Sequence, residues 1–279
     1  MEIDGTHVGT VKAVVLARGE GRRMREAATD APLTHAQRHA AAQGQKGMMP
    51  VGSASGRPFL DHVLSSLADA GCTDICLVVA PAHEHVRAHY KNAGVSRFRV
   101  HYAVQPEPLG TANAVLAARP FAADDPLLVL NSDNLYPAEA LADLVALDGP
   151  GVAAFEQAAL VEDSGFPGER VAQFAVLQSN ADGLLADIHE KPGAGLDAFG
   201  GHALVSMNLW RFDARIFPAC EDVSRSARGE FELPEAVRLA MSRGVPFRVV
   251  RARGAVLDLS RQSDIASVSA RLAGREARL

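Results

Sequence analysis

The sequence AVVLARGEGRRM, residues 13–24, joins an apolar run to a glycine-rich turn that carries arginines. A short run rich in valine predicts a buried strand over Ala13–Leu16. Glycines directly after a strand let backbone N–H groups approach phosphate oxygens, and neighbouring arginines neutralise phosphate charge. The spacing differs from the G-x-G-x-x-G of dinucleotide folds and from the G-x-x-x-x-G-K-[ST] of P-loops. The stretch therefore predicts a phosphate-binding turn after the first strand.

Apolar runs of strand length alternate with helical patterns through the first half of the chain. The predicted strands are Ala13–Leu16, Ile75–Ala80, Phe98–Ala103 and Leu127–Leu130. The predicted helices are Pro58–Ala70, His83–Tyr90, Thr111–Ala118 and Ala138–Leu147. This alternation predicts an α/β fold with a doubly wound, mostly parallel mixed sheet and helices on both faces. Ligands of such sheets bind beyond the carboxyl ends of the strands.

The second half is less regular and predicts a small β-rich insertion. Val171–Gln178 and Leu184–Glu190, joined by Asn-Ala-Asp-Gly, predict a hairpin. Later strands are expected at Leu204–Phe212, Phe247–Val250 and Ala255–Asp258, and helices at Leu233–Ser242 and from about Asp264 to Leu272. The arginine-rich end that follows is interpreted as solvated. Residues 25–45 are expected to form a flap beside the first turn, and residues 193–202, with four glycines, a ligand-contacting loop or a plain turn.

Composition excludes several classes of protein. With 279 residues, 48% hydrophobic content and a net charge of −5, the chain suits a folded protein and argues against a nucleic-acid backbone as main partner. No apolar run approaches the ~20 residues of a membrane helix, and no signal peptide is seen, so a cytoplasmic protein with no membrane partner is expected. Cys72, Cys76 and Cys220 are interpreted as small core residues.

A series of motifs follows the first turn along the chain. They are Lys46–Val51, Arg57–Val63, Gln105-Pro106 with Leu109–Ala112, Leu130–Asn134, Glu190–Pro192, Gly229–Leu233 and Leu257-Asp258. Together with Leu16–Met24, they resemble in kind and order the signatures of the sugar-phosphate nucleotidyltransferases. The resemblance spans residues 11–265 and implies a Rossmann-like nucleotidyltransferase fold. It also implies a Mg²⁺-dependent reaction in which a sugar 1-phosphate attacks the α-phosphorus of a nucleoside triphosphate and pyrophosphate leaves.

The resemblance implies a role for each matched residue. The implied nucleotide-binding residues are Leu16, Ala17, Arg18, Gly19, Glu20, Gly21, Arg22, Gln105, Gly110 and Thr111. The implied catalytic residues are Arg23, Lys46, Asp133 and Lys191, and the implied sugar-phosphate contacts are Asn134, Glu190, Asn208 and Glu230. Gln105 with Gly110 favours UTP or dTTP, while GTP stays open.

Two aspartates at strand ends are candidate metal ligands. Asp133 follows the run LLVLN and Asp258 ends another apolar pair, so both could meet at the carboxyl edge of the sheet. Mg²⁺ prefers oxygen ligands and takes few protein carboxylates. The plainer interpretation of an aspartate at a strand end is a helix cap or a turn residue. The histidines show no pairing typical of zinc sites and are interpreted as surface or core residues.

The sequence also departs from the family pattern. Arg18 stands where the family usually has Ala or Gly, Arg22 replaces Thr or Ser, and Ser132 replaces Gly. Asp258 lacks the glycine that usually follows it. The added cations either strengthen triphosphate binding or occlude the turn.

Two alternative functions therefore stay open. One is a catalytically inactive homologue that binds a nucleotide or nucleotide sugar and regulates a partner. The other is a glycosyltransferase of the GT-A type, although Asn131 and Leu135 stand where a D-x-D pair would place its second aspartate.

We expect one nucleotidyltransferase domain over residues 1–279. Residues 11–150 would form the half that binds the triphosphate, residues 151–265 the half that binds the sugar phosphate, and residues 266–279 a C-terminal helix and tail. No hexapeptide repeat is present, so no β-helix domain is expected. The resemblance implies a nucleoside triphosphate and a sugar 1-phosphate as partners, and a homodimer or homotetramer as the assembly.

Overall fold

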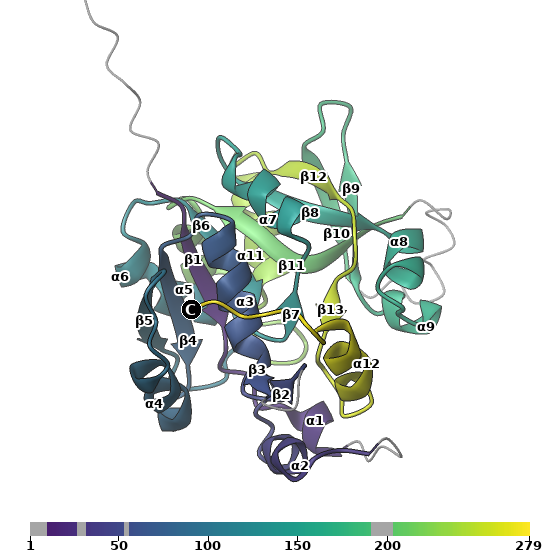
Figure 1. The fold of residues 1–279 in the computed structure, drawn as a ribbon. Helices are drawn as coiled ribbons and strands as arrows, with labels where there is room; N and C mark the ends of the chain where they lie inside the picture. The colour runs from purple at the N-terminus through teal and green to yellow at the C-terminus, as the bar shows by residue number, and fades with distance from the viewer. Residues whose placement is uncertain (1–9, 27–31, 53–55, 191–202) are drawn as a thin grey trace, which may run out of the picture.

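Strand β1 (Lys12–Leu16) lies inside a nine-stranded sheet, between β4 (Asp74–Val79) and β6 (Leu127–Asn131), in the computed structural model of the chain (Figure 1). The structure describes residues 10–26, 32–52, 56–190 and 203–279. β1 is parallel to both neighbours, and β5 (Arg99–Val104) continues the parallel order beyond β4. The predicted strands of the first half are therefore confirmed.

The second half adds antiparallel strands to the same sheet. The long strand β11 (Leu204–Phe212) pairs antiparallel with β6, β8 (Gly151–Glu156) and β9 (Ala175–Ser179). β10 (Leu185–His189) pairs antiparallel with β9, and β12 (Arg248–Ala252) pairs parallel with β8. Short pairs form outside this sheet, namely β2 (Pro50–Val51) with β3 (Arg57–Pro58) and β7 (Asn134–Leu135) with β13 (Leu257–Asp258).

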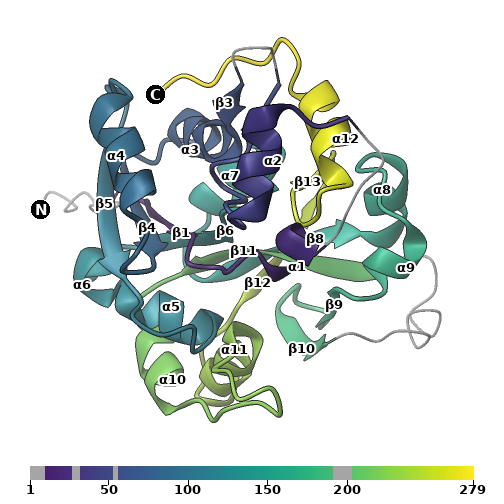
Figure 2. The same cartoon turned by 90° about the horizontal axis from the view of Figure 1, so that it is seen from below.

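Helices cover both faces of the sheet, as Figure 2 shows. One layer contains α3 (Phe59–Asp69), α4 (Glu84–Asn92), α7 (Ala138–Val145) and α12 (Asp264–Arg271). The other contains α5 (Thr111–Ala117), α6 (Arg119–Ala122), α10 (Ile216–Asp222) and α11 (Leu233–Ser242). The α/β class and the mixed sheet between two helical layers are confirmed. Among the helices of the described ranges, none is long and apolar enough to span a membrane.

The central strands are apolar at nearly every position because both of their faces are buried. Ala13 and Val15 of β1 pack in the core under α3, whereas Val14 packs in the core under α5. Cys76 of β4 belongs to the same core as Val14. Cys72, Cys76 and Cys220 are all buried, as expected, and burial raises the pKa of each thiol to about 12.

Several local predictions were wrong. The predicted strand Val171–Gln178 begins too early, because the fully buried Val171 is the last residue of helix α9 (Gly168–Val171) and strand β9 begins only at Ala175. Strand β8 and helix α8 (Gln157–Glu162) were not predicted.

The predicted flap at residues 25–45 is in part regular structure. It contains the end of α1 (Arg22–Glu26) and the whole of α2 (His35–Ala42). Thr34 and Gln37 form a reciprocal capping box that fixes the start of α2. Most of the described part of the segment is therefore helical, and residues 27–31 lie outside the described ranges.

The arginine-rich end keeps its arginines exposed, as expected, but it is also anchored to the fold. Residues 273–279 lie along α3, where Arg275 Nη2 donates to Ser66 Oγ at 2.8 Å and the backbone N–H of Arg278 donates to Ser65 Oγ at 3.1 Å. Ala277 is buried in this contact. The two small serines of α3 accept these bonds at a buried surface, which explains why this polar segment docks.

Candidate functional site

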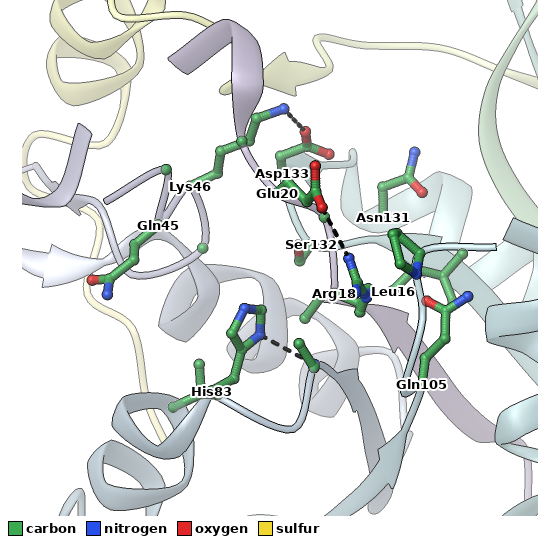
Figure 3. Close-up of a pocket in the computed structure, with 18 of the residues that line it drawn as sticks. Leu16, Arg18, Glu20, Gln45, Lys46, His83, Gln105, Asn131, Ser132 and Asp133 are labelled. Atoms are coloured by element: carbon green, nitrogen blue, oxygen red, sulfur yellow. Dashed lines mark hydrogen bonds and ion pairs between the residues drawn. The ribbon is translucent and has the colours of Figure 1, made fainter. Parts of the chain in front are cut away.

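A cleft of about 830 Å³ opens beyond the carboxyl ends of β1, β4 and β6 (Figure 3). Ligand binding was predicted at this edge of the sheet from the motifs that follow the strands. The cleft brings together fourteen of the predicted site residues: Leu16, Ala17, Arg18, Gly19, Glu20, Gly21, Arg22, Arg23, Lys46, Gln105, Gly110, Thr111, Asp133 and Glu230.

The first turn is held against the segment that follows α2. Gly21 has φ +62°, and a Cβ on it would lie 2.1 Å from the carbonyl oxygen of Gly44. Only glycine adopts this positive φ readily and also leaves room for the Gly44 backbone at this distance. Arg22 Nε donates to Glu20 at 2.8 Å, whereas Arg23 is exposed. The turn therefore presents to the cleft its backbone and the Arg23 guanidinium, for which the described residues supply no hydrogen bond or ion pair.

The Gln105 stretch and the Gly229–Leu233 motif pack on each other. Gly110 has φ +110°, and a Cβ there would lie 2.4 Å from the carbonyl oxygen of Phe231. Thr111 Oγ1 accepts the backbone N–H of Leu233 at 2.9 Å, at the start of α11. Two motifs far apart in the sequence thus form one wall of the cleft. Thr111, predicted to bind nucleotide, has this structural contact as well.

Lys46 and Asp133 form an ion pair across the cleft. Lys46 Nζ lies 2.9 Å from Asp133 Oδ2, and the two side chains are 22% and 19% exposed (Figure 3). Lys46 comes from the segment between α2 and β2, and Asp133 from the turn after β6. Within the described part of the chain, neither side chain has a second hydrogen-bonding or ion-pair partner, so a bound polyanion could draw Lys46 away.

Asp258 lies beside Asp133. Strand β13 pairs with β7, and the backbone N–H of Leu259 donates to the Asp133 carbonyl at 2.8 Å. Asp258 is buried, and burial together with the Asp133 carboxylate raises its pKa to about 6. The predicted convergence of the two aspartates is therefore present.

This carboxylate pair fits Mg²⁺. Asp258 Oδ1 is buried and makes no hydrogen bond of good geometry to the described residues, although Arg170 Nη2 lies 3.1 Å away. Carboxylate oxygens are the ligands Mg²⁺ prefers, usually one or two from protein together with substrate phosphates. No group of three or more His, Cys, Asp or Glu that could hold a metal unaided occurs in the described ranges. The donor set thus suits an ion that is completed by a phosphate ligand.

Arg170, on α9, was not identified from the sequence. Besides Asp258 it contacts Asp264, with Nη1 2.8 Å from Oδ1. Asp264 in turn accepts the backbone N–H groups of Ser260 and Arg261, at 2.9 and 2.8 Å. Arg170 is therefore fixed as a cation beside the aspartates, and no sequence pattern around it signals this long-range contact.

Four predicted residues that the structure describes do not line this cleft: Asp258, which lies behind Asp133, and Asn134, Asn208 and Glu190. Asn134 is buried below it, and its Nδ2 has no partner among the described side chains and backbone. Asn208 is exposed on β11 with φ +59°, at a register shift of the strand. Glu190 is exposed after β10, and Lys191 lies outside the described residues, as does the loop 193–202.

Two of the histidines interpreted as surface or core residues are half-buried at the cleft. His83 and His85 line the cleft after β4, the neighbour of β1, and their rings lie 5.4 Å apart. Burial lowers the pKa of both. Asn131, the last residue of β6, and Ser132, which follows it, also line the cleft. The carboxyl end of β6 was the signal that would have identified Asn131 and Ser132, whereas His83 directly precedes α4 and His85 lies within it.

Comparison with known proteins identifies the family to which the chain is similar. The family model described as nucleotidyl transferase matches residues 12–273. The chain is 31% identical over 256 residues to the UTP–glucose-1-phosphate uridylyltransferase AglF of Haloferax volcanii, covering 91% of this chain and 93% of that protein. It is 26% identical to a glucose-1-phosphate thymidylyltransferase of Streptomyces griseus, covering 93% of this chain and 65% of that protein.

A solved structure shares the fold. The UDP-glucose pyrophosphorylase in complex with UDP-glucose aligns with a TM-score of 0.72 at 16% identity, covering 94% of this chain and 98% of that chain. The family model spans nearly the whole chain, and its match includes every strand that borders the cleft. The chain therefore belongs to the nucleotidyl transferase family.

Proposed function

We propose that the protein transfers a nucleotidyl group from a nucleoside triphosphate, UTP or dTTP, to a sugar 1-phosphate and releases pyrophosphate. The observation that carries the proposal is the Asp133–Asp258 pair with Lys46 beside it, at the same cleft as the glycine turn. The named activities of the 31% and 26% identical relatives support the substrate class.

The chain's own groups would align two polyanions. The backbone of Gly19–Gly21 and the guanidinium groups of Arg22 and Arg23 would hold the triphosphate. Lys46 would leave Asp133 for the phosphates, since a desolvated ammonium pairs well with phosphate oxygens. Gln105 and Gly110 would hold the base. Such positioning is most of what nucleotidyl transfer requires from a protein.

Asp133 and Asp258 would hold Mg²⁺. The ion would neutralise charge on the phosphate oxygens. With Lys46 withdrawn, Asp133 offers both carboxylate oxygens, and Asp258 offers the oxygen that lacks a hydrogen bond within the described structure. Arg170 would keep Asp258 ionised and oriented.

The sugar phosphate would bind at the β11 side of the cleft. Glu230 lines the cleft, and Asn208, Glu190 and Asn134 remain candidates for contacts to the sugar hydroxyls. Lys191 remains the candidate cation for the sugar phosphate.

The test is to incubate the purified protein with Mg²⁺, each of several nucleoside triphosphates and a panel of sugar 1-phosphates, and to measure pyrophosphate. We expect release only when both substrates are present, with UTP or dTTP preferred. Nucleotide binding by calorimetry without release across the panel would favour the inactive regulatory homologue. Transfer from a preformed nucleotide sugar to an acceptor, without pyrophosphate, would favour the glycosyltransferase.

A further inference from the structure

The Arg18 side chain is enclosed in the cleft but poorly satisfied. It is 14% exposed, and its Nη1 lies 3.6 Å from Glu20 Oε1. Its Nη2 lies 3.5 Å from the carbonyl oxygen of Pro106, at the outer limit of a hydrogen bond. Its Nε is buried and has no partner among the described residues. A desolvated guanidinium with unused donors requires an acceptor, and a bound ligand can supply one.

Within the described residues, the neighbouring Gln105 lacks a donor for its side-chain oxygen, whereas Arg18 lacks acceptors for some of its N–H groups. Its Nε2 donates to the carbonyl of Gly110 and to Asn113 Oδ1, both at 2.9 Å. A backbone carbonyl can only accept, so the Gln105 atom that faces Gly110 must be the amide nitrogen. Both amide hydrogens are then committed to the protein. The remaining polar atom, Oε1, can act only as an acceptor for a ligand.

Arg18 and Gln105 therefore present a donor and an acceptor on one wall. Arg18 contacts the carbonyl oxygen of Pro106, which directly follows Gln105 in the chain. The side chains of Arg18 and Gln105 both line the cleft (Figure 3). The complementary ligand carries a ring N–H next to a ring C=O. Uracil and thymine carry this pair at N3 and O4, and guanine at N1 and O6. Cytosine and adenine carry the reverse pair, an unprotonated ring nitrogen next to an amino group.

Resting on the proposed function, we propose that Arg18 is a specificity-determining residue that donates to the ring carbonyl of a keto base. The adjacent ring N–H of that base donates to Gln105 Oε1, and Asn113 is a positioning residue that holds the Gln105 amide in this orientation. With cytosine, the Arg18 donors would face the amino group and Gln105 Oε1 would face an unprotonated nitrogen. Both contacts would then be unsatisfied.

The first experiment compares UTP with CTP in the wild type and in Arg18→Ala. We expect the wild type to prefer UTP in kcat/KM by roughly 10- to 100-fold, the factor for losing such buried hydrogen bonds. Arg18→Ala should reduce that preference by about tenfold, through a higher KM for UTP and with little change for CTP. Arg22→Ala is the matched control, because Arg22 lies on the same turn but is exposed, and it should leave the UTP/CTP ratio unchanged.

Two other results for Arg18→Ala would overturn the inference. Equal losses with UTP and CTP would mean that Arg18 binds phosphate. Equal gains would mean that its bulk obstructs the cleft.

The second experiment does not depend on the folding of a variant. Wild-type protein is titrated by calorimetry with UTP, N3-methyl-UTP and CTP in the absence of a sugar phosphate. We expect N3-methyl-UTP and CTP to bind at least about tenfold more weakly than UTP. Equal binding of all three would sink the inference.

Asn113 is tested by a pair of variants. Asn113→Leu removes the acceptor for Gln105 Nε2 and should reduce the UTP/CTP ratio severalfold. Asn113→Asp keeps an acceptor at the same place and should retain the ratio. A purely structural role would change stability in Asn113→Leu but leave the ratio intact.

Failure of this inference is separable from failure of the proposed function. Pyrophosphate release with all bases at equal rates would remove the base selection and keep the nucleotidyl transfer. Selective binding of UTP without pyrophosphate release from any pair of substrates would do the reverse.

Discussion

Asp133 has two roles that exclude one another at a single moment. It pairs with Lys46 at 2.9 Å, and it is a candidate ligand for Mg²⁺. Asp133→Asn keeps the shape of the side chain but removes its charge. We therefore expect turnover to fall by at least about 10²-fold, as when one charge-stabilising group is removed from an active site, with limited loss of triphosphate binding.

The measurement is pyrophosphate release together with calorimetry of the triphosphate. Near-wild-type activity of the Asp133→Asn variant would refute the metal assignment. A variant that binds neither substrate and melts early would point to a structural role of Asp133 instead.

Lys46 is the second residue whose charge can be tested alone. Lys46→Met keeps most of the aliphatic stem, so the expected effect is loss of phosphate contact, with a decrease in kcat/KM of about 10²-fold. Lys91→Met is the matched control, because Lys91 is exposed on α4, outside the residues that line the cleft, and should retain full activity. Comparable losses in both variants would argue against a specific role for Lys46.

Among single residues, the sequence predicted those that lie in motifs at strand ends. Gln105 and Asp133 both line the cleft, because a motif directly after a parallel strand lies at the carboxyl edge of the sheet, whereas Lys46 reaches the cleft from the segment between α2 and β2. The sequence did not predict Arg170, whose contact with Asp258 depends on how α9 packs against β13. Contacts between elements that neither adjoin nor pair leave no local pattern.

Helix α11 and the Gln105 stretch are joined by one hydroxyl group. Thr111 Oγ1 accepts the N–H of Leu233, which is one of the donors left free at a helix start. Thr111→Val is nearly isosteric but removes the acceptor of this partly buried hydrogen bond, so we expect a loss of about 0.5–1.5 kcal/mol in the free energy of unfolding.

Urea unfolding followed by circular dichroism measures this difference. Thr111→Ser keeps the hydroxyl group and is expected to lose less than half as much. Equal stability of Thr111→Val and the wild type would show that water or another group satisfies the Leu233 N–H.

Helices and strands whose apolar residues recur at a regular spacing were predicted well, and those without such a spacing were missed. Helix α3 has buried residues on nearly all sides and still shows helical spacing, whereas β8, Gly-Val-Ala-Ala-Phe-Glu, is short and built of small residues. Helix α2 is rich in Ala, Gln and His and was mistaken for a flap. The Thr34–Gln37 capping box was the local signal that identifies it as a helix. The antiparallel pairing of β11 with three other strands depends on long-range contacts, so the sequence did not predict it.

Across the whole molecule, the last residues connect distant parts of the fold. Residues 273–279 bind α3, which begins beside the Lys46 segment, and α12 before them follows the strand that carries Asp258. Ala277→Asp places an unpaired charge at a buried position, and we expect it to lower the free energy of unfolding by about 2 kcal/mol or more.

Ala273→Asp is the matched control, since it makes the same substitution at an exposed alanine of the same segment. It should change the free energy of unfolding by less than about 0.5 kcal/mol. Thermal or urea unfolding of the two variants makes the comparison. Equal stability of both would mean that the segment contributes nothing to the fold in solution.

The pairing of β13 with β7 has a consequence for how the protein is made. Asp133 leaves the ribosome before the antiparallel strands β8 to β11 exist, whereas Asp258 and the strand that carries it follow all of them. A nascent chain that lacks β13 already contains the turn after β1 and the Gln105 stretch, but only one of the two carboxylates proposed to hold Mg²⁺. The proposed Mg²⁺ site therefore has both of its carboxylates only after every strand of the large sheet has been synthesised.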